Sequence, residues 1–196
     1  GILLAAPQLG ATTVESIGKL ESRDYVTLTI NTMKDFGVTV IVDANDKGDE
    51  RFSIADDAHF QGQRGYTIEG DWSNAAIWVV AAALTGQSIT ITGLNKDSVQ
   101  ADRRIMTIVE GAGAQLTWQG MKLTVSGKAS QPLHVDLGQC PDLLPVLSAL
   151  ACGIQGESAF VNGARLRIKE SDRLEAVAQL VRDLGGSVRM DGDDLY

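Results

Sequence analysis

The residues best suited to chemistry lie in one charged segment, residues 165–174. It places four cations and two carboxylates within ten residues: Arg165, Arg167, Lys169, Glu170, Asp172 and Arg173. The cations can bind phosphate or carboxylate groups through charge-assisted hydrogen bonds. The carboxylates beside them can give and take protons. This combination favours chemistry on a small substrate that carries several negative charges.

An amphipathic helix is expected directly after this segment. Apolar residues recur there at intervals of three and four, which predicts one apolar face made of Leu174, Val177, Leu180, Val181 and Leu184. The charged residues then occupy a loop and the first helical turn, where backbone N–H groups and the helix dipole favour anions. A solvated helix cap is the alternative interpretation, since exposed ion pairs contribute little to stability.

A further acidic position, Asp142, follows Pro141 and precedes an apolar stretch at residues 143–151. The stretch predicts a helix, so Asp142 should lie near the helix N-terminus, where the dipole stabilises a carboxylate. Two roles stay open for Asp142 at this point. It is either a functional carboxylate or an ordinary acidic residue of a first helical turn.

The chain repeats one structural pattern three times. An Ala-rich apolar helix, a turn and a β-branched strand recur, and the strand ends in a glycine at residues 18, 93 and 163. A polar loop, an amphipathic helix stopped by glycine, and further strands complete each repeat. This order predicts an α/β (α+β) fold with right-handed crossovers and partly parallel sheets covered by helices. Residues 43–49 are expected to form an exposed hairpin tip, and residues 66–71 to begin a new unit.

The composition argues against several classes of protein. The chain has 196 residues, 44% of them hydrophobic and 21% charged, as in ordinary globular proteins. A net charge of −8 argues against broad nucleic-acid binding, which needs a basic surface. The longest apolar run, residues 75–84, is too short to span a bilayer, and nothing resembles a signal peptide. We therefore expect a cytoplasmic protein that does not act in a membrane.

The cysteines and histidines show no spacing typical of a metal site. Cys140 and Cys152 lie in an apolar stretch predicted to be helical, so we expect small core residues rather than reactive thiols. His59 and His134 are isolated in the sequence, and neither is expected to be catalytic.

Three segments together resemble the signatures of one enzyme family. Residues 167–174, Arg-Ile-Lys-Glu-Ser-Asp-Arg-Leu, resemble the Lys-Glu-(Ser/Thr)-Asp-Arg signature of the 5-enolpyruvylshikimate-3-phosphate (EPSP) synthase family. Residues 18–25 are similar to its Gly-x-Leu-x-Ser-(Arg/Lys)-Pro-Tyr segment, and residues 136–142 to its Asp-x-x-x-x-Pro-Asp segment. The three occur in the family's order, and weaker similarity spans essentially the whole chain. Asp24 departs from the pattern, because it replaces the usual proline.

The resemblance implies a fold of repeated βαβαββ units packed into two domains, the inside-out α/β barrel of the enolpyruvyl transferases, with substrates bound between the domains. That fold is incomplete here, with three units at most and the first without its opening strand. Residues 1–66 are expected to be the remaining part of the N-terminal-side domain. Residues 67–196 are expected to be two units of the second domain.

The resemblance also implies an activity. The family transfers the carboxyvinyl group of phosphoenolpyruvate to the 5-hydroxyl of 3-phosphoshikimate and releases phosphate, through a tetrahedral intermediate and without a metal or cofactor. Asp142 matches the acid that holds the shikimate ring and is the expected base for the 5-hydroxyl. Glu170 matches the acid that exchanges a proton with the methylene carbon. Lys169 would contact the reacting hydroxyl and share in the proton transfer.

The remaining matched positions would bind the two substrates. Arg173 matches the arginine that binds phosphoenolpyruvate, and Ser22 and Tyr25 match residues that hold 3-phosphoshikimate, as Asp142 and Lys169 also do. Ser22 could instead cap the following helix. Asp24 weakens the assignment of these family roles to Ser22 and Tyr25, because it puts a negative charge near an anionic substrate.

Three other family segments have no counterpart here: an amino-terminal segment with Lys and Arg, a Ser-Ser-Gln loop, and a carboxy-terminal Asp-His-Arg-Met segment. The chain is therefore expected to be the central piece of a monomeric enzyme and to be inactive, or nearly so, alone. The alternatives are a sibling transferase acting on a UDP-sugar, or a non-catalytic ligand-binding or folding module. Asp142, Lys169 and Glu170 together favour the enzyme, because binding alone does not need groups that transfer protons.

Overall fold

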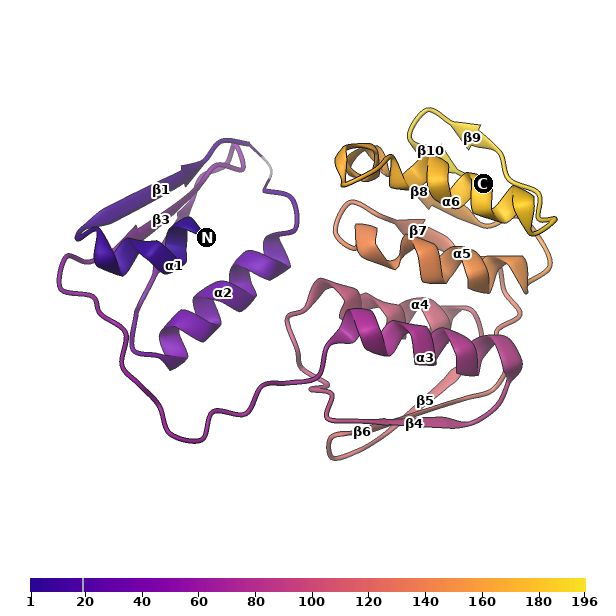
Figure 1. The fold of residues 1–196 in the computed structure, drawn as a ribbon, viewed down its shortest axis with the longest axis horizontal. Coiled ribbons are helices and arrows are strands. Elements are labelled where there is room, and N and C mark those ends of the chain that lie inside the picture. Colours follow the sequence, from indigo (N-terminus) through magenta and orange to yellow (C-terminus); the bar gives the residue numbers. More distant parts are fainter. Residues whose placement is uncertain (19) are drawn as a thin grey trace. The chain divides into compact units, whose positions relative to one another are not determined.

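The computed structural model describes residues 1–18 and 20–196, which form two compact units, Gly1–Ile68 and Glu69–Tyr196 (Figure 1). Each unit has its own core of buried apolar side chains. In the part of the chain that is described, no helix combines the length and the apolar character needed to cross a membrane. The assignment of the units to the two domains of the family stays a prediction.

The first unit is a small sheet with two α-helices. Its elements are α1 (Ile2–Ala5), β1 (Thr12–Ser16), α2 (Arg23–Asp35), β2 (Ile41–Ala44) and β3 (Glu50–Ile54). The sheet has the order β1-β3-β2 and is antiparallel throughout. Strands β2 and β3 form the predicted hairpin, and the turn between them is exposed. The core is small and is formed by Ala6, Met33, Val38 and Ile54.

The second unit contains two sheets. The strands of the first are β4 (Ile89–Thr92), β5 (Gln115–Gln119) and β6 (Lys122–Ser126), in the order β4-β6-β5. Those of the second are β7 (His134–Asp136), β8 (Ala159–Val161), β9 (Met190–Asp191) and β10 (Asp194–Leu195), in the order β7-β8-β10-β9. Among the strand pairs of the described residues, β7–β8 alone is parallel.

The same strand order recurs in all three sheets, which confirms the repeat. In β1-β3-β2, β4-β6-β5 and β8-β10-β9, the first strand pairs with the last strand of the following hairpin. An opening strand, β7, is present only in the third sheet as described. Residues 66–71, expected to begin the second unit, contain no assigned strand, although the Gly70 N–H donates to the Gly93 carbonyl at 2.8 Å. The described residues form three open sheets and no closed barrel.

Helices cover these sheets and build the larger core. They are α3 (Trp72–Thr85), α4 (Ile105–Gly111), α5 (Leu144–Cys152) and α6 (Arg173–Asp183), with short 3₁₀ helices η2 (Ala101–Arg104), η3 (Pro141–Leu143) and η4 (Ala164–Ile168) between them. Helix α3 packs against α4 and α5, and α5 packs against α6 (Figure 1). Their inward faces carry completely buried residues, among them Trp72, Leu144, Leu147 and Leu174.

The apolar face of α6 is narrower than predicted. Leu174, Val177 and Val181 are buried as expected, but Leu180 is 51% exposed and Leu184 is 77% exposed. Leu180 lies about 120° around the helix from Leu174, at the edge of any face centred on that residue. Leu184 lies just past the last helical residue and follows the chain out of the core.

The prediction for the cysteines was correct for Cys140 and wrong for Cys152. Cys140 is 1% exposed, although it precedes η3 rather than lying in a helix. Cys152 is exposed, because it is the last residue of α5 and the chain turns away there at Gly153. Burial raises the pKa of the Cys140 thiol to about 11, and the charge of Asp102 adds to the effect.

We predict that the two thiols differ sharply in reactivity. At mildly alkaline pH a water-soluble thiol reagent should modify Cys152 quickly and Cys140 only after denaturant is added, because thiolate is the reactive form. Counting modified thiols with time before and after unfolding checks this. The Cys152→Ser variant should show no fast phase, and equal rates for both thiols in the folded wild type would contradict the buried position of Cys140.

Candidate functional site

One carboxylate, Asp142, binds two of the four cations of the charged segment. Oδ1 of Asp142 accepts from Nη1 of Arg173 at 2.5 Å and from Nζ of Lys169 at 3.3 Å. These side chains are 25–35% exposed, so the cluster is half-buried. The structure thus brings Asp142 together with residues 27 and 31 positions further along the chain.

Short turns with buried neighbours fix this cluster. Asp142 lies in η3, a single turn that leads directly into α5, and Leu143 and Leu144 beside it are buried. Lys169 and Glu170 lie in the loop between η4 and α6. Leu166 before that loop and Leu174 after it are both completely buried. The loop is therefore anchored at both ends by buried side chains.

Arg173 joins the cluster to the second acid of the segment. Its Nη1 donates to Asp142 and its Nη2 donates to Oε2 of Glu170 at 2.8 Å. The Glu170 side chain is 81% exposed. The pKa of Glu170 lies below its usual value, because its own backbone N–H and then the Arg173 guanidinium favour the charged form. Glu170 is therefore a carboxylate at neutral pH.

Arg167 has a structural role. It donates from Nε to Asp193 at 2.7 Å, from Nη1 to Asp172 at 3.0 Å, and from Nη2 to the Gly192 carbonyl at 2.6 Å. These bonds tie the start of α6 to the β9–β10 turn. Sequence patterns could not distinguish Arg167 from Lys169 and Arg173, because its carboxylate partners lie 5 and 26 residues away.

Asp172 is the N-cap of α6. Its Oδ1 accepts from the backbone N–H of Glu175 at 3.0 Å, as in a standard helix cap. This bond lowers the pKa of Asp172, and Arg167 lowers it further. The helix cap proposed as an alternative for the charged segment therefore exists, but it uses Asp172 and Arg167 and leaves Lys169, Glu170 and Arg173 to the Asp142 cluster.

The other predicted substrate-binding residues, Ser22 and Tyr25, belong to the first unit. Ser22 precedes α2 in the left-handed backbone conformation, with φ of 52°. Ser22 is the N-cap residue of α2, as the alternative interpretation expected, but its side chain makes no capping hydrogen bond to the helix. Tyr25 lies in the first turn of α2. The roles of both residues in binding stay predictions.

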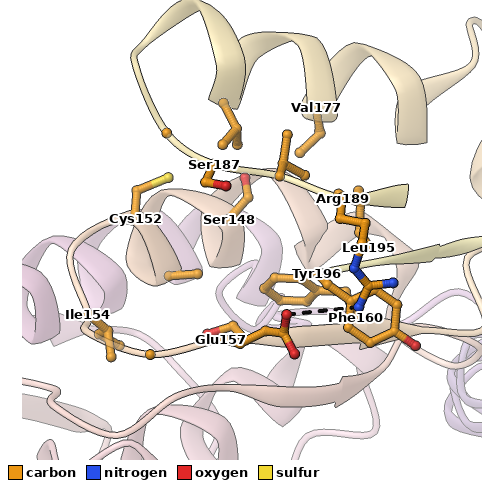
Figure 2. Close-up of a pocket in the computed structure, with 16 residues that line it drawn as sticks. Ser148, Cys152, Ile154, Glu157, Phe160, Val177, Ser187, Arg189, Leu195 and Tyr196 are labelled. Carbon is orange, nitrogen blue, oxygen red and sulfur yellow. Dashed lines mark ion pairs between the residues drawn. The ribbon is translucent and has the colours of Figure 1, made fainter. Parts of the chain in front are cut away.

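A cavity of about 440 Å³ lies elsewhere in the second unit (Figure 2). It opens at the C-terminal end of α5, between that helix, α6 and the β8–β10 pair, and Cys152, Phe160, Val177 and Arg189 are among its lining residues. Arg189 is paired there with Glu157 and stacks on the ring of Tyr196. Asp142 lies before the opposite end of α5, a helix about 13 Å long. None of the predicted site residues lines this cavity.

Within residues 1–18 and 20–196, the surroundings of the cluster include a buried carboxyl group but no group of side chains suited to a metal ion. Among the described residues, no group of three or more His, Cys, Asp or Glu side chains is placed to hold a metal ion. A buried carboxyl group, Asp102, lies close enough to Asp142 and Lys169 for their charges to act on it. Asp102 was not predicted to be a site residue, because an acidic residue beside Arg103 and Arg104 is typical of a solvated loop.

The family model for EPSP synthase (3-phosphoshikimate 1-carboxyvinyltransferase) matches residues 1–196. The chain belongs to the EPSP synthase family. It is 38% identical over 196 residues to the 3-phosphoshikimate 1-carboxyvinyltransferase of Clostridium kluyveri, covering all of this chain and 45% of that protein. It is 35% identical over 177 residues to the enzyme of that name from Clostridioides difficile, covering 90% of this chain and 39% of that protein. The chain thus spans less than half the length of these relatives.

Solved structures support the EPSP synthase fold. The EPSP synthase of Acinetobacter baumannii matches with a TM-score of 0.69 and 22% identity, over 95% of this chain and 43% of that one. The enolpyruvyl transferase NikO of Streptomyces tendae matches with a TM-score of 0.64 and 17% identity, over 95% and 42%. The predicted family and the mixed helix-and-strand fold are therefore confirmed.

In this EPSP synthase chain we predict that the charge of Asp172 stabilises α6. A carboxyl group whose folded pKa is lowered stabilises the fold above its unfolded pKa, near 3.8, and loses that effect as the pH falls through the folded pKa. Asp172→Ala should therefore lower the melting temperature near neutral pH and much less in strong acid. Circular-dichroism melts at the two pH values check this.

Asp172→Asn is the matched control, because its amide oxygen can still accept the bond from Glu175. It should lose less stability than Asp172→Ala. Identical melting curves for the wild type and Asp172→Ala at neutral pH would contradict the capping role.

Proposed function

We propose that the protein containing this chain transfers the carboxyvinyl group of phosphoenolpyruvate to the 5-hydroxyl of 3-phosphoshikimate and releases phosphate. The observation that carries the proposal is the cluster of Asp142, Lys169, Glu170 and Arg173. It combines cations for anionic substrates with two carboxylates for proton transfer. The relatives named as 3-phosphoshikimate 1-carboxyvinyltransferase favour this substrate over a UDP-sugar.

Arg173 is suited to bind phosphoenolpyruvate. It already donates from two nitrogens to two separate carboxylates, Asp142 and Glu170. The same pair of donors fits two oxygens of a carboxylate or phosphate group, which a lysine cannot match. A bound anion would compete for these donors, so substrate binding would free Asp142 and Glu170 for their own roles.

Asp142 and Lys169 are suited to act on the hydroxyl of 3-phosphoshikimate. Asp142 offers a carboxylate acceptor in a rigid turn, and Lys169 adds an ammonium group beside it. Together they can orient the hydroxyl and take its proton as the oxygen attacks the central carbon of phosphoenolpyruvate. A carbon–oxygen bond forms in this step, and the methylene carbon must gain a proton.

Glu170 is suited to exchange that second proton. Its exposed carboxylate is ionised at neutral pH, so it must first collect a proton, give it to the methylene carbon, and then take it back. The returned electron pair restores the carbon–carbon double bond as the bond to phosphate breaks. One residue can thus serve both the addition and the elimination step.

The remaining parts of the proposal concern the whole protein. Ser22 and Tyr25 would hold 3-phosphoshikimate from the N-terminal-side domain, to which we assign the first unit. The second unit would supply the Asp142 cluster as part of the second domain. We propose a cytoplasmic monomer that acts on small molecules and uses no cofactor.

We predict that Glu170→Ala in the intact enzyme lowers turnover by about 100-fold or more, the typical contribution of a positioned acid or base. The dissociation constant for 3-phosphoshikimate should change little, because Glu170 acts on the other substrate. Steady-state kinetics and calorimetric titration measure the two quantities.

Glu175→Ala is the control for removing a nearby carboxylate, because Glu175 lies in the first turn of α6. Glu175 pairs with Arg182, away from the Asp142 cluster, so its loss should leave turnover nearly unchanged. Equal losses of turnover and binding in Glu170→Ala would contradict the proton-transfer role. Unchanged turnover would show that the reaction does not need Glu170.

A further inference from the structure

Asp102 is a buried carboxyl group that the proposed chemistry does not use. It lies in η2 and is 1% exposed. Oδ2 accepts a hydrogen bond from the Ser73 hydroxyl of α3 at 2.6 Å. Oδ1 is buried and has no hydrogen-bond partner in the described part of the chain. Asp102 therefore has one satisfied and one unsatisfied oxygen.

This arrangement is unfavourable for folding. A buried charge or unpaired polar atom loses its hydration without full compensation. Burial raises the pKa of Asp102, the Ser73 bond opposes the shift, and the charges of Asp142 and Asp71 add to it, while Lys169 lowers it. Because the buried carboxyl group of Asp102 destabilises the fold, its presence needs a reason other than stability.

The position of Asp102 supplies that explanation. Helix α3 packs against both η2, which carries Asp102, and η3, which carries Asp142. The charge of Asp102 also raises the pKa of Cys140, two residues before Asp142. Asp102 is thus electrostatically coupled to the buried side of the η3 turn and to the Lys169 ammonium group.

The two cations lie at different distances from Asp142. Arg173 approaches its Oδ1 to 2.5 Å, whereas the Lys169 nitrogen stays at 3.3 Å. A negative charge on Asp102 would attract the ammonium group and repel the Asp142 carboxylate, and both effects are strong in a poorly hydrated interior.

We propose that Asp102 is a positioning residue, which holds the Lys169 ammonium group and the Asp142 carboxylate in the arrangement that receives the substrate hydroxyl. It acts through these two residues and does not touch substrate. The proposal rests on the proposed function, since it gives Asp102 a part in the same reaction.

The first test is the stability of Asp102→Asn, which has the same shape and can keep the bond from Ser73. Because the folded pKa of Asp102 is raised, its destabilising effect is absent below the unfolded pKa near 3.8 and grows as the pH rises through the folded pKa. Asp102→Asn should therefore melt at the same or a higher temperature than the wild type near neutral pH. The gain should vanish below pH 3.8.

The second test is the turnover of Asp102→Asn in the intact enzyme. We expect kcat to fall roughly 10- to 100-fold, as misplaced groups typically cause, and the pH profile of kcat to shift. A purely structural role would not shift the pH profile. Ser98→Ala is the matched control, because Ser98 is also buried and polar in the same loop, and its hydroxyl donates to Glu69. It should lower the melting temperature without changing kcat.

Unchanged kcat in a stable Asp102→Asn variant would overturn the inference. So would a joint loss of stability and turnover without a shifted pH profile, since this indicates a structural residue only. Asp142→Ala and Lys169→Ala, measured alongside, separate this from a failure of the proposed function. If both variants kept full turnover, the roles proposed for Asp142 and Lys169 would fail, and the inference with them. If both lost turnover while Asp102→Asn kept it, the inference alone would fail.

Discussion

The rest of the site depends on the ion pairs that the Asp142 carboxylate makes with Arg173 and Lys169. One oxygen atom holds the side chains of Arg173 and Lys169, which reach it from a segment 27–31 residues away. Through Arg173 it also fixes Glu170. Four groups that can bind anions or move protons therefore share one small surface. This arrangement requires the η3 turn and the loop before α6 to keep a fixed distance, which α5 and α6 provide by packing together.

The charged residues of the segment fall into two groups, one that holds the loop in place and one that belongs to the Asp142 cluster. Arg167 and Asp172 hold the loop to α6 and to the β9–β10 turn. Lys169 and Arg173 bind Asp142, and Glu170 pairs with Arg173. The cavity at the other end of α5 is lined by none of these groups (Figure 2). The chemistry that we propose would thus take place on a half-buried surface.

Much of the fold could be predicted from periodicity and glycine positions. The repeat of helix, strand and hairpin was visible because each unit ends its strand in glycine at a similar spacing, and the three sheets share one strand order. Local patterns could not give the width of a buried face, so Leu180 and Leu184 were misplaced. They also could not show that α5 ends at Cys152 with its thiol exposed.

The site could be predicted only in part, because some of its contacts join residues that are far apart in the sequence. The types and spacing of Lys169, Glu170 and Arg173 indicated anion chemistry, and the resemblance to the family added Asp142. The structural use of Arg167 and the burial of Asp102 depend on partners far away in the sequence, and no local pattern reports them. Whether a charged residue serves the fold or the chemistry is decided by which side chains tertiary packing places next to it.

The most direct test is an amide chemical-shift titration of this chain, first with 3-phosphoshikimate and then with phosphoenolpyruvate. If the Asp142 cluster binds substrate, the largest shifts will occur at Asp142 and at residues 169–173, and phosphoenolpyruvate will add shifts at Glu170 and Arg173. A well-dispersed spectrum whose shifts gather around Cys152 and Arg189 instead, with the Asp142 cluster silent, would contradict the account.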